Sequence, residues 1–260
     1  MDFGAFDPGA FDLGALYPFI LIGFAAQLVD GAVGRAFGVI MNTLLVGFLG
    51  VPPALASQRV HVVECFTTFT SAISHLLHRN IDKALFFRLL IPGMIGGISG
   101  AYLLSNIDGG FIKPFVLAYL TLIGFYLLAR GLFWPPKPRM AKIVAPLGLV
   151  GGFLDAVGGG GWGPVVTSNL LIQGAEPRKV VGTVNSVEFF LTIAVSATFI
   201  SQIGITDLAG ATLGLLIGGV LGAPFGAFAA RHFPAKFMLV MVGIVLVVTS
   251  GYGVYSALSK

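Results

Sequence analysis

The sequence predicts an all-α integral membrane protein built from two inverted repeats, each a glycine-broken re-entrant helical hairpin followed by three transmembrane helices. Three observations lead to this fold class. Of the 260 residues, 56% are hydrophobic and 10% are charged; long windows carry no charge; and the second half repeats the pattern of the first. Soluble domains have about 25% charged residues because their surfaces face water, so this surface is expected to face lipid.

Five windows contain no Asp, Glu, Lys or Arg, and most are long enough to cross a hydrocarbon core of about 30 Å as a helix of roughly 20 residues. They are Ala36–Gln58, Leu89–Ile107, Ala156–Ala175, Leu208–Ala230 and Phe237–Ser259. A multi-pass protein in the lipid bilayer is therefore expected. The net charge of +4 is attributed to basic loops on one side of the membrane, and no nucleic-acid partner is expected.

The two halves align along most of their length. An offset of 125 residues places Asp30 over Asp155, and an offset of 124 places Glu64 over Glu188. The alignment defines a tail at 1–15, a first repeat at 16–133, a hinge at 134–142 and a second repeat at 143–260. The halves thus predict an internal structural repeat, which is common in transporters.

Each repeat begins with a glycine-interrupted apolar stretch, Leu16–Gly50 or Ile143–Gly174. The expected full-length helices are Pro53–Leu77, Ala84–Asn106, Phe111–Phe133, Pro177–Gln202, Asp207–Ala230 and Pro234–Ala257. Lys and Arg in short loops favour the cytoplasm, which places the hinge inside and the acidic tail outside. If each interrupted stretch dips in and returns, the halves have opposite topology; two parallel four-helix halves are the alternative.

The interrupted stretches carry the first candidate site. The run Gly158–Gly161 permits positive φ and lets backbone N–H groups converge, and a helix that restarts after such a loop suits an anion. Its expected contacts are Gly159, Gly160, Gly161 and Trp162. The alternative is a close-packed helix crossing.

Arg35, in the first interrupted stretch, is the best single candidate to contact an anion, because its guanidinium offers a fork of donors. A salt bridge to Asp30 is the alternative, and Gly160 stands in its place in the second half. The polar residues expected to line the same cavity are Asn42, Thr43, Ser168, Asn169 and Asn185. Hydrogen bonding between helices is the other interpretation of these five.

A carboxylate stands at the same place in both halves, Glu64 and Glu188, inside an apolar helix. At helical spacing Glu64 shares a face with His61, and Glu188 with Asn185. Ionisable groups at membrane depth are costly, so the candidates for proton coupling or gating are Glu64, Glu188, His61, Asp30 and Asp155. The alternative is that the two glutamates only stabilise the fold. No catalytic set, metal site or cofactor motif is found, so no enzyme is expected.

The run Gly-Leu-Val-Gly-Gly-Phe-Leu-Asp-Ala-Val-Gly-Gly-Gly-Gly-Trp-Gly-Pro at 148–164, followed by Gly182-Thr183-Val-Asn185-Ser186 and Glu188, resembles the sulfite exporter TauE/SafE family. A weaker echo at 23–38 departs from the family pattern at Gly34-Arg35-Ala36. The resemblance implies a carrier of the bacterial inner membrane that exports a small sulfur-containing anion such as sulfite or sulfoacetate. The paired carboxylates Glu64 and Glu188 leave protons open as a second partner. A passive anion channel, a carrier for a non-sulfur organic anion, and a homodimer remain open.

Overall fold

The computed structural model describes residues 13–33, 37–77, 79–133, 143–167, 169–170, 173, 175, 177–204 and 212–222, and, near the end of the chain, 240, 243–244, 246–248, 250–252 and 254–255. Within these residues the secondary structure is helical and contains no β-strand. The predicted all-α class is confirmed for this part of the chain.

The first repeat contains two helices on either side of residues 34–36, followed by three long helices. These are α1 (Leu13–Val33), α2 (Phe37–Thr43), which continues as the π-helix η2 (Leu44–Phe48), α3 (Pro53–Leu77), α4 (Lys83–Asn106) and α5 (Gly109–Phe133). α3 has the bounds predicted from the sequence. α4 begins next to its N-cap Asp82, whose side chain accepts hydrogen bonds from two amides of the first turn.

The second repeat has the same order of elements in the residues that the structure describes. α6 (Ala145–Gly158) is separated by the glycine loop from the π-helix η3 (Trp162–Thr167), and α8 (Pro177–Ile203) follows. A shorter apolar helix spans Thr212–Gly222, and the described residues between 240 and 255 are helical. The predicted break at the glycines is confirmed.

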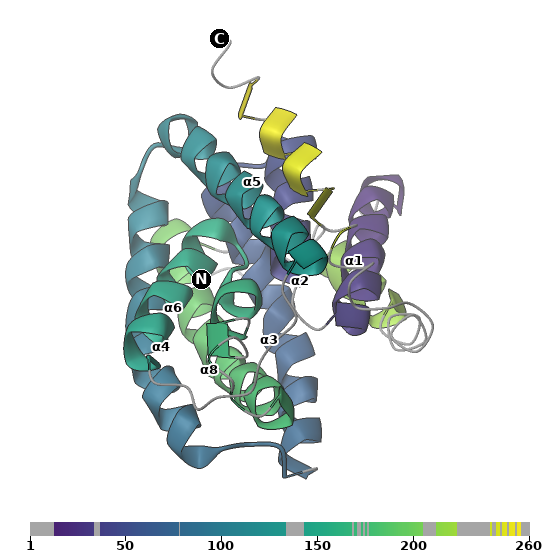
Figure 1. Cartoon of the computed structure of the whole chain (residues 1–260). Helices are drawn as coiled ribbons and strands as arrows, with labels where there is room; N and C mark the ends of the chain where they lie inside the picture. Colours follow the sequence, from purple (N-terminus) through teal and green to yellow (C-terminus); the bar gives the residue numbers. More distant parts are fainter. Residues whose placement is uncertain are drawn as a thin grey trace, which may run out of the picture.

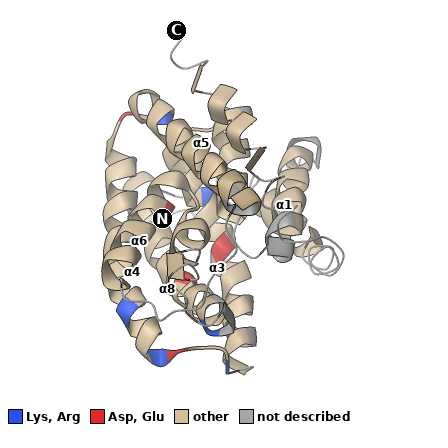
Figure 2. Ribbon diagram, in the orientation of Figure 1, with Lys and Arg blue, Asp and Glu red and all other residues tan. Residues whose placement is uncertain are grey.

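Three of the described helical segments are long and apolar enough to cross a membrane: Lys83–Asn106, Gly109–Tyr126 and Gly182–Ile203. Large apolar side chains of α4, among them Phe87, Ile91 and Ile95, are exposed, which suits contact with lipid. Figure 2 shows basic segments at the ends of helices and acidic segments inside the bundle beside α3 and α8. The structure thus agrees with an integral membrane protein.

Glycines bring helices of opposite repeats into backbone contact. α4 lies on α6 (Figure 1), and a Cβ added at Gly100 would lie 2.7 Å from a carbonyl oxygen of α6. In the same way, the helix Thr212–Gly222 lies on α1, and a Cβ added at Gly222 would lie 2.7 Å from a carbonyl oxygen of α1. Each repeat therefore packs its glycine-rich helix on the interrupted stretch of the other, and the two repeats are interlocked.

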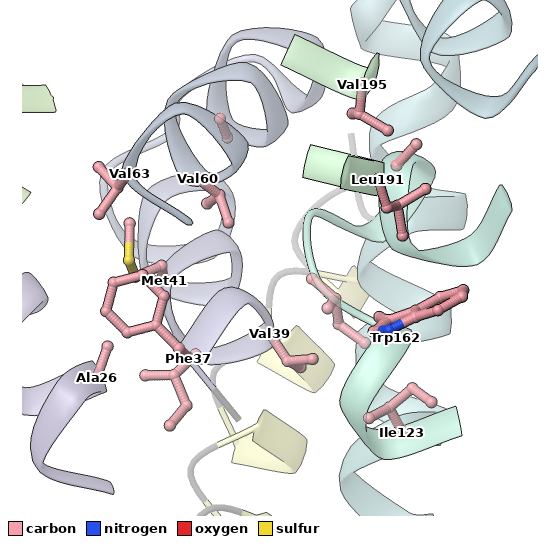
Figure 3. Packing of buried hydrophobic residues seen from close by; sticks show 14 of the residues in the cluster. Ala26, Phe37, Val39, Met41, Val60, Val63, Ile123, Trp162, Leu191 and Val195 are labelled. Atoms are coloured by element: carbon pink, nitrogen blue, oxygen red, sulfur yellow. The ribbon is translucent and has the colours of Figure 1, made fainter. Parts of the chain in front are cut away.

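α3 and α8 are packed against each other, and buried side chains from both surround Trp162 and the start of α2 (Figure 3). Trp162 is fully buried. Its indole Nε1 donates to the carbonyl oxygen of Val184 at 3.1 Å. This bond fixes η3 to α8 and places the glycine loop, which immediately precedes Trp162, at the centre of the bundle.

Candidate functional site

The glycine loop that ends α6 lies directly against the first repeat. Gly159 has a φ of 63° and Gly160 a φ of 146°, conformations that residues with a Cβ rarely adopt. A Cβ at Gly160 would overlap the backbone of Gly38 and Val39 at the start of α2. The consecutive glycines are therefore needed both for the turn and for the approach of the two interrupted stretches.

Asp155 binds the four amides of this loop. The N–H groups of Gly159 and Gly160 donate to its backbone carbonyl oxygen, the latter at 3.0 Å. The N–H groups of Gly161 and Trp162 donate to its carboxylate Oδ1 at 2.7 and 2.9 Å. Of the amides expected from the sequence to converge on an anion, two thus bond the carboxyl group of Asp155 and two bond its backbone carbonyl oxygen.

His61 of α3 joins this arrangement to the first repeat. Its Nε2 lies 3.1 Å from Oδ2 of Asp155, and its Nδ1 lies 2.8 Å from the carbonyl oxygen of Ser57, one turn earlier. The exposed fraction is 0% for His61 and 1% for Asp155. The protein thus encloses both side chains almost fully, and the pair links α3 to the end of α6.

Two more side chains of the first repeat hold the loop from the other side. The amide of Asn42, on α2, donates to the carbonyl oxygen of Gly158. The hydroxyl of Ser57 donates to the carbonyl oxygen of Ala156 at 2.5 Å. Because α6 ends here, its last carbonyls lack partners within the helix, and these side chains supply donors to two carbonyls near its end.

A cavity of about 280 Å³ lies between the repeats, and both contribute to its walls. It is just below the roughly 300 Å³ at which pockets for drug-sized ligands begin, so its size suits a small ion. Its polar lining consists of Gln27, Glu64, Thr67, Thr68, Ser71, Asp155, Asn185 and Glu188, and its other lining residues are Phe37, Gly38, Val39, Gly160, Gly161, Gly163 and Pro164. None of the described lining residues is Lys or Arg.

The paired carboxylates face this cavity from α3 and α8. Glu64 is 5% exposed, and its Oε1 lies against Gly38, 2.6 Å from where a Cβ would stand. Asn185 lies one turn before Glu188, and its amide donates to the hydroxyl of Ser71 on α3 at 3.0 Å. Hydrogen-bonding groups from both repeats thus meet at one small volume.

The structure brings six of the residues singled out from the sequence to the cavity: Asp155, Gly160, Gly161, Glu64, Glu188 and Asn185. Asn42, Thr43, Gly159 and Trp162 are buried but are not part of its lining, and Asn169 donates to the carbonyl of Val165 in its own segment. Arg35, Ser168 and the side chain of Asp30 lie outside the described residues.

Sequence reasoning missed Gln27, Thr67, Thr68 and Ser71. For three of them a signal was present, because Glu64, Thr67, Thr68 and Ser71 follow the i, i+3, i+4, i+7 spacing of one helix face. Gln27 lies alone in an apolar stretch, and its position in the cavity depends on how α1 packs.

Comparison with known proteins agrees with this architecture. A family model described as "Sulfite exporter TauE/SafE" matches residues 19–253. A relative named "Probable membrane transporter protein YtnM", from Bacillus subtilis (strain 168), is 42% identical over 237 residues, which are 88% of this chain and 79% of the relative. No solved structure matches the chain significantly. The chain therefore belongs to the sulfite exporter TauE/SafE family and is a membrane transporter.

Proposed function

We propose that the protein is a multi-pass secondary transporter of the bacterial inner membrane that exports a small sulfur-containing anion such as sulfite or sulfoacetate. The observation that carries the proposal is the cavity of about 280 Å³ between the repeats, lined by side chains of both and adjoining both interrupted stretches. Transporters with internal repeats bind their substrates at such a place. The sulfur anion itself is inferred from the family.

Inverted topology is part of this proposal. It is supported by the reciprocal contacts in which α4 lies on α6 while the helix Thr212–Gly222 lies on α1. A pseudo-two-fold axis in the membrane plane would relate these two contacts and would pass between α3 and α8. Rocking of one repeat against the other would then expose the cavity to each side in turn.

The acidic lining indicates how an anion could be held. Glu64, Glu188 and Asp155 share one small cavity, and a further negative charge a few ångströms from ionised carboxylates would be strongly repelled in a medium of low dielectric constant. Protonation of at least one glutamate removes part of this repulsion. Arg35, two residues before the lining residue Phe37, is proposed to supply positive charge. Anion binding and proton uptake are therefore coupled.

Flux measurements in proteoliposomes test the proposal. Labelled sulfite and sulfoacetate should show saturable uptake and counterflow, with dependence on a pH gradient that Glu188→Gln reduces. Arg35→Ala should lower flux at least about tenfold, the equivalent of roughly 1.4 kcal/mol, while the exposed Arg88→Ala should leave it unchanged.

Each alternative has its own outcome in these measurements. Flux without saturation or counterflow would identify a passive channel. Uptake of carboxylates in preference to both sulfur anions would identify a carrier for another organic anion. Normal flux in Arg35→Ala would remove Arg35 from the site, and flux insensitive to both pH and Glu188→Gln would refute the coupling.

A further inference from the structure

The hydrogen bonds of His61 fix where its protons must be. A carbonyl oxygen only accepts, so the 2.8 Å contact between Nδ1 and the carbonyl of Ser57 requires a hydrogen on Nδ1. The Ser57 hydroxyl, 3.3 Å from Nδ1, offers no alternative donor, because its single hydrogen is donated to the carbonyl of Ala156 at 2.5 Å. Nδ1 is therefore protonated in this conformation.

This assignment leaves one further proton to place. Nε2 of His61 lies 3.1 Å from Oδ2 of Asp155, and a hydrogen bond there needs a proton between the two atoms. The pair holds it either as imidazolium and carboxylate or as neutral imidazole and carboxylic acid. If this proton leaves, the Nε2 lone pair faces the lone pairs of Oδ2, and the attraction becomes repulsion.

We propose that the His61–Asp155 pair is a proton-binding site of the transporter, and that its single proton holds the glycine loop against the first repeat. The same carboxylate accepts the amides of Gly161 and Trp162 through Oδ1, so turning the carboxyl group away from His61 disturbs both bonds. Asp155, Gly160 and Gly161 also line the cavity. Loss of the proton therefore changes the wall of the cavity itself.

Other ionisable groups of the described residues surround the pair, among them the thiol of Cys65, four positions after His61 on α3. Glu64 lies one turn further along α3, Glu188 lines the same cavity from α8, and the hydroxyl of Tyr119 on α5 lies beside Gly161. The described residues of α2 carry no ionisable group, and those of α6 carry only Asp155. The released proton can pass to water in the cavity or to either glutamate, which gives it a route from the pair to the substrate site.

The second repeat lacks an equivalent pair. Asn185 occupies the place of His61, and its amide donates to Ser71 at 3.0 Å. An amide keeps its hydrogens at every pH of interest, so α8 contributes no titrating partner at this position. In transport, which rests on the proposed function, the pair would supply a proton site between α3 and α6 in addition to the two glutamates, and α8 would supply no histidine at the equivalent position. The proton-binding site itself does not depend on the substrate.

The fluorescence of Trp162 offers a test without any substrate. The chain has two tryptophans, so Trp134→Phe leaves Trp162, which is fully buried and bonded to Asp155, as the only reporter. The emission of Trp162 is followed in detergent micelles as the pH is raised from about 5 to about 9. We expect one reversible transition, with the loop held on the acidic side and released on the basic side.

Two conservative variants each replace one member of the pair by an amide, so that the proton shared between imidazole and carboxyl no longer exists. In His61→Gln the amide nitrogen donates to Asp155 at every pH, and in Asp155→Asn the amide nitrogen donates to a neutral imidazole. Both should lose the transition, whereas His75→Gln, further along α3, should retain it. If His61→Gln does not fold, Asp155→Asn provides the test.

Absence of a transition in the Trp134→Phe protein, or its persistence in both conservative variants, would overturn the proposal. A transporter that moves neither sulfur anion would still show the transition, so failure of the proposed function is distinguishable from failure of the proton site.

Discussion

α3 and α8 occupy equivalent places in the two repeats, yet the centres of the two helices differ in charge. Both carry a glutamate that faces the cavity. One turn earlier, α3 has His61 bonded to a buried carboxylate, whereas α8 has Asn185 bonded to a hydroxyl. The flanking helices are packed alike, since glycine-mediated contacts join α4 to α6 and the helix Thr212–Gly222 to α1.

This difference separates what maintains the fold from what performs transport. Close packing of helices through glycines recurs in both repeats because it depends only on the shape of the helix surfaces. Motion of two repeats related by a two-fold axis requires matching surfaces in both. Asn185 stands on α8 where α3 has His61, so of these two helices α3 alone contributes an ionisable partner to Asp155. The repeats are therefore expected to respond alike to changes in packing and differently to changes in polar residues.

The largest effect is expected from Asp155→Ala. It leaves the amides of Gly161 and Trp162 buried without an acceptor and Nε2 of His61 buried without a partner, and each such loss costs about 1–3 kcal/mol. We expect stability to fall by about 3–9 kcal/mol, seen as a large drop in the thermal midpoint by size-exclusion chromatography in detergent. The exposed cap Asp108→Ala, which loses a 3.0 Å bond from the amide of Phe111, should cost only about 1 kcal/mol. Equal losses in the two variants would contradict this account of Asp155.

Much of the fold could be predicted from the sequence, and the reason lies in local patterns. The bounds of α3 follow from Pro53 and the apolar run, and the break before Trp162 follows from the consecutive glycines. The shared position of Glu64 and Glu188 followed from the repeat alone. These features depend on neighbours within about one helical turn or on internal symmetry, both of which are visible in a single chain.

The hydrogen bonds between distant residues of the site could not be predicted in the same way. The bond between His61 and Asp155 joins residues 94 positions apart, and the alignment of the repeats gives no information on which helix of one contacts which helix of the other. Four adjacent amides are equally suited to a bound anion and to a carboxylate of the chain. The choice between a bound anion and the carboxyl group depends on the orientation of the Asp155 side chain, which folds back toward the end of its own helix.

An intermediate loss of stability is expected from changes at the glycine contacts, and the loss should be similar in the two repeats. A Cβ at Gly96 would overlap the carbonyl of Leu149, and one at Gly218 would overlap the carbonyl of Ile20. Alanine at either position should force the helices apart and cost about 1–3 kcal/mol. Gly219→Ala is the matched control, because among the described residues its Cβ would meet only the ring of Phe37, at 3.8 Å; it should be neutral or stabilising by about 0.5–1 kcal/mol. A marked loss at Gly96 with none at Gly218 would show that the two contacts are not equivalent.

The smallest loss of stability is expected at Asn185, the uncharged residue of α8 that corresponds to His61 of α3. Asn185→Ala removes the 3.0 Å bond to the hydroxyl of Ser71, which joins uncharged groups in a half-buried position and is worth about 0.5–1.5 kcal/mol. A double-mutant cycle with Ser71→Ala isolates the bond, since the double variant should lose less than the sum of the single variants. The same cycle on His61→Ala and Asp155→Ala should give a larger coupling energy that changes with pH, because that pair needs a proton and the amide does not. A coupling between Asn185 and Ser71 that equals the other or varies with pH would mean that the two helices are alike in chemistry as well as in packing, and the distinction between His61 and Asn185 would fail.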